Sequence, residues 1–430
     1  MRISTIQAFN TGIRGIQDNY SAVTRTQEQI TSGKRILTPA DDPVASVRLL
    51  QLDQEASKLA QYKDNLTAAT NSLTQEEAIL NSVNNILQRV REIALEAGNG
   101  ALDAGGRQAL AQELAEREGE LHGLLNSQNA RGEYLFGGYQ SDTQPFVKNP
   151  DGSYSYAGDE GQRSIQIGSA KMVAINDNGK ELFVDVGNVN RVQTDDSGAA
   201  DARISLGVVE NKGRYDTEFP RPDGVRINIS ATPDDPADPD SPVSYSYALV
   251  DADGNPVVDA DGAPITGTLE ANAAGSYEIR YAGVAVTLDG ELADGDQFGI
   301  RPGDADNNSE KRSVLDTVSL LRETLENTDD STEGKLQRRD MLSISVQNLD
   351  NAMNQVLGVQ TSLGARLNVI ESTQLENDEA SLINATVQSG LEDLDYAEAL
   401  SRLSMESIVL QAAQQSFVKV SGLSLFNFLR

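Results

Sequence analysis

The chain has 430 residues, too many for one compact hydrophobic core, so two or three domains are expected. Its 35 Lys and Arg residues stand against 65 Asp and Glu, and the net charge of −30 argues against binding nucleic acid or an anionic membrane surface, since both attract basic patches. The sequence contains no cysteine, which excludes disulfides and thiolate metal sites.

The first twenty residues contain no continuous apolar segment and no small-residue cleavage site, so we expect no cleaved Sec-type signal peptide. No stretch reaches the roughly 18 apolar residues that span a bilayer. We therefore expect a soluble chain that is made without a cleaved leader.

A first helix is predicted near the N-terminus, because apolar residues from Ile6 to Ile30 recur at alternating steps of three and four. The pattern stops at TSGKRILTPADDP. Gly33 suits the left-handed position that closes a helix, and Asp42 followed by Pro43 predicts the N-cap and first residue of the next helix.

The next helix carries the strongest pattern, a leucine at every seventh position from Leu52 to Leu87. Residues three positions after the later leucines are apolar, and only Glu76 interrupts them. This predicts a long helix with a coiled-coil-like face that ends near EAGNGALDAGG. A further helix carries Leu110, Leu114, Leu121 and Leu124 on one face.

The C-terminal part has similar stripes, one from Leu342 to Ile370 and one from Tyr396 to Phe417. The chain ends in GLSLFNFLR, which places five large apolar residues in seven positions. Such a tail needs another apolar surface to pack against. The simplest candidate is the apolar seam of the N-terminal helix, of the same chain or of a neighbour.

The middle of the chain is different, because residues 141–305 contain 11 of the 13 prolines and 29 acidic against 12 basic residues. The alternating runs VRINIS, VSYSYALV, SYEIRYAGVAVTL and QFGIRP predict strands bounded by turns. SATPDDPADPDSPVS cannot be a helix. We therefore expect a β-rich insertion between two helical halves.

The predicted fold is mainly α with a β-rich insertion: long antiparallel coiled-coil-like helices come from both ends of the chain, and an outer β domain is inserted between them. A helix ending near residue 130 must pack on one that begins near 311. The expected domains are a terminal helical domain (1–45 with 376–430), a long-helix bundle (46–140 with 306–375) and the insertion (141–305).

No residue pattern indicates an enzyme, a cofactor or a metal. His122 is the only histidine, and an ordinary position on a helix surface explains it better than a ligand role. Asp251 to Gly262 loosely resembles a calcium loop, but Pro256 and Gly262 occupy positions that need Gly and Glu. Tight turns at the two Asp-Gly pairs are the favoured explanation, and a weak cation site is the alternative.

The terminal stripes differ from the others because no further predicted helix is left to cover them, which favours self-assembly. The candidate assembly interface comprises Ile6, Phe9, Ile13, Ile16, Tyr20, Val23, Ile30, Leu400, Leu403, Leu410, Phe417, Leu423, Leu425, Phe426, Phe428 and Leu429.

Three segments carry a resemblance to a known family. TSGKRILTPADDPVAS (31–46) resembles the N-terminal signature of flagellins and hook-associated proteins. RGEYLFGGYQSDTQPF (131–146) and LEDLDYAEALSRL, with the tail that follows, resemble the hook–filament junction branch of that family. Flagellins typically have DDAAG where this chain has DDPVA. The resemblance covers about residues 1–146 and 311–430.

The resemblance implies a structural subunit at the hook–filament junction, exported unfolded through the flagellar type III apparatus with an uncleaved signal. It implies terminal helices that are disordered in the monomer and fold on incorporation, and an extracellular location after a transient cytoplasmic state. The implied partners are identical copies in a ring, the neighbouring hook-associated junction protein, flagellin, and a cytoplasmic chaperone at the C-terminal region.

Two alternatives stay open at this stage. A flagellin would carry the same terminal stripes, and localisation on the filament would separate it from a junction subunit. A coiled-coil-presented adhesin would use the insertion as a binding module, and strong binding of a glycan or host ligand by residues 141–305 would favour it.

Overall fold

The computed structural model describes residues 2–99, 102–233, 241–259, 261–304 and 309–426, with the backbone alone at 2–6, 8 and 421–426. Two compact units are present. The first contains residues 1–67, 166–171 and 370–430, and the second contains residues 68–165 and 172–369.

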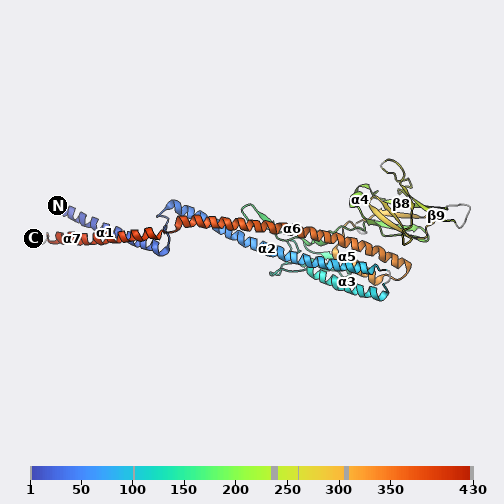
Figure 1. Cartoon of the computed structure of the whole chain (residues 1–430), viewed down its shortest axis with the longest axis horizontal. Helices are drawn as coiled ribbons and strands as arrows, with labels where there is room; N and C mark the ends of the chain where they lie inside the picture. The colour runs from blue at the N-terminus through green and yellow to red at the C-terminus, as the bar shows by residue number, and fades with distance from the viewer. Residues whose placement is uncertain (1, 100–101, 234–240, 260, 305–308, 427–430) are drawn as a thin grey trace. The chain divides into compact units, whose positions relative to one another are not determined.

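The first unit is helical. It contains α1 (Arg2–Ser32), the start of α2 (Pro43–Ala97), the end of α6 (Thr332–Glu392) and α7 (Tyr396–Phe426), and α1 packs along α7 (Figure 1). As predicted, α1 ends just before Gly33, whose φ is +72°. The Asp42 carboxylate accepts the Ala45 N–H at 2.9 Å, so it caps α2 as expected.

The second unit contains a helical layer made by the rest of α2, α3 (Ala104–Leu125), α5 (Val314–Asn327) and the first part of α6. The predicted packing of the helix near residue 130 on the one near 311 is confirmed, because α3 contacts α5. Ion pairs join α2 to its neighbours: Arg89 Nε lies 2.7 Å from Glu113 of α3, and Arg91 Nε lies 2.7 Å from Asp350 of α6. The heptad leucines of α2 are fully buried here.

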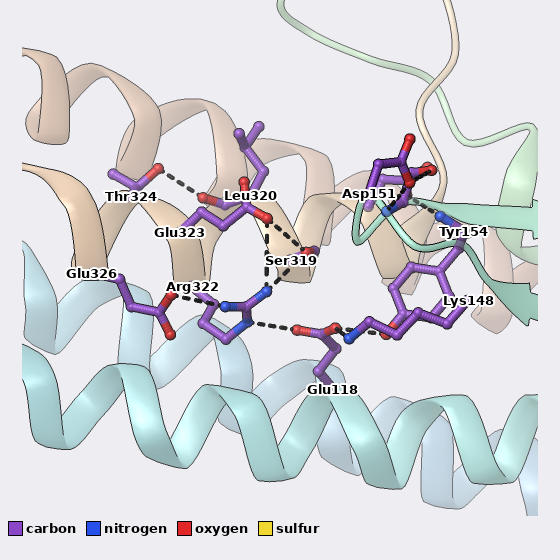
Figure 2. Close-up of polar contacts among 12 residues, drawn as sticks. Glu118, Lys148, Asp151, Tyr154, Ser319, Leu320, Arg322, Glu323, Thr324 and Glu326 are labelled. Carbon is purple, nitrogen blue, oxygen red and sulfur yellow. Dashed lines mark hydrogen bonds and ion pairs between the residues drawn. The ribbon is translucent and has the colours of Figure 1, made fainter.

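A buried carboxylate, Glu118 of α3, joins two helices and a hairpin (Figure 2). It accepts hydrogen bonds from Arg322 Nε of α5 at 2.9 Å, from Lys148 Nζ at 2.8 Å and from the Tyr154 hydroxyl at 2.5 Å. Burial alone would raise the pKa of Glu118. These three donors stabilise the charged form, and the pKa therefore lies below its usual value. The network therefore ties the hairpin to the helices.

Four short strands form hairpins beside the helices: β1 (Phe146–Lys148) with β2 (Tyr154–Tyr156), and β3 (Ser164–Gln166) with β4 (Met172–Ala174). A π-helical turn, η1 (Lys180–Val184), follows them. Phe146 packs edge-on to Phe183 of this turn, with ring centroids 6.1 Å apart. These short strands were not predicted, since three residues carry too little alternation to be detected.

The interruption in the α2 heptad has a structural reason. Glu76 is 1% exposed, and its carboxyl accepts the Asp177 N–H at 3.0 Å. The Asp177 carboxylate in turn pairs with both terminal nitrogens of Arg366 on α6, at 2.8 and 2.9 Å. Burial raises the pKa of Glu76 to about 8, and the negative charge of Asp177 adds to the effect.

The β domain is a two-layer sandwich. One sheet has the order β10-β9-β8-β13-β5, and the other has the order β11-β12-β6 with β7 also paired to β12; all pairs are antiparallel. The elements are β5 (Val192–Gly198), β6 (Ala202–Ile204), β7 (Val208–Val209), α4 (Lys212–Glu218), β8 (Val225–Pro233), β9 (Val243–Val250), β10 (Thr266–Leu269), β11 (Tyr277–Tyr281), β12 (Val284–Gly290) and β13 (Gln297–Pro302).

The core of the sandwich lies between the two sheets, where Ile227 and Phe298 of one sheet meet Val286 and Leu288 of the other. The four predicted strand runs are confirmed as β8, β9, β11 with β12, and β13. Of the proline-rich segment that was expected not to be helical, residues 234–240 lie outside the described residues.

The two Asp-Gly pairs form turns, as predicted. Gly254 and Gly262 have φ values of +88° and +82°. The Asp251 carboxylate accepts the N–H groups of Asp253 and Asn255, and Asp259 makes the equivalent bonds in the next turn. These aspartates therefore stabilise their own loops.

Candidate assembly interface

The terminal helices contact each other through interlocking small and large residues. The rings of Phe9 and Phe417 lie with centroids 5.0 Å apart. A Cβ atom added to Gly12 would meet the Phe417 ring at 3.0 Å, so the absence of a side chain at Gly12 lets this ring approach α1. Nearer the end of α1, Arg402 donates a hydrogen bond to the Gln29 side chain at 2.8 Å.

The base of this pair is held by backbone hydrogen bonds between segments far apart in the sequence. Arg35 N–H donates to the Glu392 carbonyl at 2.7 Å, and Leu394 N–H donates to the Gly33 carbonyl at 3.0 Å. The Asp395 carboxylate then caps α7 by accepting the Ala397 N–H at 2.9 Å. These bonds consequently fix the junction where α1 ends and α7 begins.

The loop before α2 is folded around one carboxylate. Asp41 accepts the N–H groups of Leu37 at 2.9 Å and Thr38 at 3.1 Å, and it forms an ion pair with Arg25 of α1. The bond from Leu37, followed by that from Thr38, lowers the pKa of Asp41 below its usual value. The TPADDP segment is thus attached to α1.

Packing of α1 on α7 leaves much apolar surface uncovered. Phe9, Tyr20 and Leu400 are 45%, 63% and 55% exposed. The other described candidates are half-buried: Ile13, Ile16, Val23, Ile30, Leu403, Leu410 and Phe417. Ile6, Leu423, Leu425 and Phe426 lie on helical backbone, while Phe428 and Leu429 lie outside the described residues.

The structure reveals further exposed apolar residues that the leucine heptads did not indicate. They lie on α7, on the end of α6 and at the start of α2: Met405, Ile408, Val409, Val418, Val420, Leu375, Leu382, Ile383, Val44, Val47 and Leu50. Val44, Val47 and Leu50 recur every three residues, a spacing that could have revealed a second stripe. The exposed apolar surface of these helices therefore extends beyond the predicted stripes.

The surroundings of His122 and of the potential metal ligands bear on other chemistry at the described residues. His122 is half-buried, with Nε2 3.0 Å from the Phe146 carbonyl oxygen, and it packs near the Tyr154 ring, so it is less of a surface residue than expected. No group of three potential metal ligands occurs among the described residues. Within the same part of the chain, no helix combines the length and apolar character needed to cross a membrane.

Comparison with known families identifies this arrangement. The model of the bacterial flagellin N-terminal helical region matches residues 3–141, and the model of the flagellin C-terminal helical region matches residues 346–429. Together they cover more than half of the chain, which belongs to the flagellin-like family and is a structural component of the bacterial flagellum.

Particular relatives come from one branch of this family. Flagellar hook-associated protein 3 of Escherichia coli (strain K12) is 23% identical over 427 residues, 99% of this chain and 99% of that protein. Its counterpart from Salmonella typhimurium is 33% identical over 183 residues, 43% of this chain and 57% of that protein. The crystal structure of the flagellar junction protein FlgL from Legionella pneumophila is 26% identical, with a TM-score of 0.61, and the match covers 80% of this chain and 99% of that one.

Proposed function

We propose that this chain is the subunit that joins the flagellar hook to the filament, and that identical copies assemble into a ring through their terminal helices. The carrying observation is the apolar surface that stays exposed on α1 and α7 after these helices have packed on each other. Monomeric proteins rarely expose contiguous apolar surface of this kind. Neighbouring subunits would cover it.

Similarity along the whole chain supports a junction subunit over a filament subunit. The relative from Escherichia coli matches through the β domain as well as the terminal regions, whereas the two flagellin models stop at residues 141 and 346. The neighbours in this role would be the other hook-associated junction protein on one side and flagellin on the other.

The proposal includes a route to the assembly site. The chain would leave the cytoplasm unfolded through the flagellar export apparatus, with a chaperone covering the C-terminal region until then. The terminal segments 1–45 and 376–430 would form the axial layer, 46–140 with 306–375 the next layer, and 141–305 the outer domain. Ordering the termini only on incorporation would hinder premature assembly, because the entropy cost is offset by subunit contacts alone.

The test is deletion of residues 423–430 in a motile strain whose own copy is removed. We expect the truncated chain to keep the unfolding transition of its second unit but to fail to support filaments. Leu400→Asp should also impair incorporation, while Val243→Asp, which alters an exposed apolar residue of β9, should not.

Two outcomes would contradict the proposal. Filament growth with the truncated chain would show that the tail is dispensable. A fluorescently labelled full chain distributed along the whole filament, instead of at its base, would identify a filament subunit.

A further inference from the structure

The outer face of the five-stranded sheet contains a polar depression. Phe298 and Ile300 of β13 are buried in the sandwich core, so the alternate residues Gln297, Gly299 and Arg301 lie on the opposite face. The depression has a volume of about 400 Å³. Its polar side chains are Asp195, Ser197, Asp223, Arg226, Gln297 and Arg301.

The depression exists because a glycine interrupts a row of side chains. Gly299 pairs with Asp195 of β5 on one side and with Arg226 of β8 on the other. The register shifts between Gln297 and Gly299, which marks a β-bulge. A glycine inside a strand often marks a bulge or a place where a ligand or another backbone approaches closely.

Arg226 is exposed and forms few contacts with other side chains of the domain. It forms no ion pair with any described carboxylate, whereas every other arginine between residues 141 and 305 does. Among the described residues, its guanidinium donates to the Ala252 carbonyl oxygen at 3.5 Å, which is longer than a well-formed hydrogen bond. Its donors are therefore available to a ligand.

Arg301 provides a second guanidinium. Its closest carboxylate oxygen, on Asp195, is 4.0 Å away. Arg301 lies two residues along β13 from Gly299, the partner of Arg226, so the two arginines are diagonal neighbours roughly 7–8 Å apart at the backbone. Two arginines at this spacing can both donate to one carboxylate.

The remaining side chains suit hydroxyl groups. The Asp195 carboxylate accepts the Ser197 N–H at 3.0 Å and keeps further acceptor capacity, and Asp223 also lines the depression. Gln297 can both donate and accept. The strongly acidic domain would repel a ligand with several negative charges, which excludes polyphosphates and sulfated polymers as good ligands.

We propose that this depression binds a sugar that carries a single carboxylate, the chemistry shared by uronic and sialic acids. The carboxylate would accept hydrogen bonds from Arg226 and Arg301, and ring hydroxyls would donate to Asp195 and Asp223. The depression is of the size that accommodates one small ligand. This activity is additional to the assembly role of the terminal helices.

The experiment is calorimetric titration of the full chain with glucuronate and, separately, with N-acetylneuraminate, with glucose and acetate as comparison ligands. We expect saturable binding of at least one acidic sugar, and binding of glucose and acetate weaker by about tenfold or more. Comparing the glucuronate and N-acetylneuraminate titrations shows whether the depression binds uronic acids, sialic acids or both.

Three variants test the assignment. Arg226→Gln should weaken binding by about tenfold or more, while Arg214→Gln, on α4 and paired with Glu218, should bind like the parent. Gly299→Val should weaken binding without changing any charge, because its side chain would fill the floor of the depression. Circular dichroism shows whether each variant is folded. If Gly299→Val does not fold, Arg226→Gln alone tests the proposal.

The proposal is overturned by any of three results: no binding of either acidic sugar at about 20 mM, acetate binding as tightly as the acidic sugars, or parent-like affinity in folded Arg226→Gln.

Discussion

The two helical regions of this protein use similar heptad stripes and achieve very different burial. Leu73, Leu80 and Leu87 of α2, all in the second unit, are fully buried. Phe9 and Tyr20 of α1 hold equivalent seam positions and remain about half or more exposed. The stripe alone therefore does not decide whether a position is core.

The number of neighbours makes the difference. In the second unit α2 is joined to α3 and α6 by ion pairs, α3 packs on α5, and hairpins lie beside them. In the first unit the described part of α1 packs along α7. Two helices can bury one narrow seam, whereas several enclose a core on more than one face. Similar sequence patterns thus yield a stable core in one region and an assembly surface in the other.

The sharpest test within the enclosed region is Glu118→Ala. It leaves Lys148 and Arg322 without their shared carboxylate, so we expect the free energy of unfolding of the second unit to fall by about 3–5 kcal/mol. Denaturant titration measures it. Glu120→Ala removes a carboxylate two residues away that is exposed and paired only within α3, and it should change little. Equal effects of the two variants would show that the Glu118 network does not stabilise this region.

The difference in burial between the two helical regions can be measured by replacing a leucine with alanine in each. Leu80→Ala should destabilise the monomer by about 2–5 kcal/mol, because it creates a cavity among fully buried side chains. Leu400→Ala removes an exposed side chain and should cost less than about 0.5 kcal/mol in the monomer. A large monomer effect of Leu400→Ala would mean that α7 is already part of a closed core.

We expect Glu76 to make the stability of the second unit depend on pH. Its folded pKa of about 8 lies above the ordinary 4.5, so the folded state retains a proton that the unfolded chain releases. Its stabilising contribution is fully present below about pH 4.5 and is lost as the pH rises through about 8. We expect the free energy of unfolding to fall by roughly 2–4 kcal/mol across this interval.

Denaturation at a series of pH values tests this expectation. Glu76→Gln should flatten the profile, because the amide does not titrate, and Glu77→Gln serves as the matched control on the same helix turn. A profile in Glu76→Gln as steep as in the parent would assign the pH dependence to other groups.

The smallest expected effect lies at the junction where α1 ends and α7 begins. Gly33→Ala places a side chain at φ +72°, and its Cβ would lie 3.0 Å from the Tyr396 hydroxyl oxygen, so we expect a local cost of about 1–2 kcal/mol. Faster amide exchange around residues 29–35 would report it. Gly15→Ala, inside α1 with no atom near the added carbon, should be neutral or slightly stabilising. Unchanged exchange in Gly33→Ala would show that this junction adapts.

Much of the fold follows from local patterns in the sequence. The period of the apolar residues predicts the long helices, Gly33 and Asp42-Pro43 predict the break between the first two, and alternation predicts four strand runs of the sandwich. These signals are readable because each depends on residues within a turn or two of one another. The candidate interface is also predicted in this way, because the sequence offers no further helix to pack against the terminal stripes.

Only the tertiary structure decides which side chains from distant segments contact each other. Glu76 appears in the sequence only as a defect in a stripe, and its role depends on Asp177 about a hundred positions later. Glu118 gains its meaning from Lys148 and Arg322, and Gly299 from Asp195 and Arg226 on neighbouring strands. Strand order and side-chain pairing depend on which distant segments meet, and local periodicity carries no information about that choice.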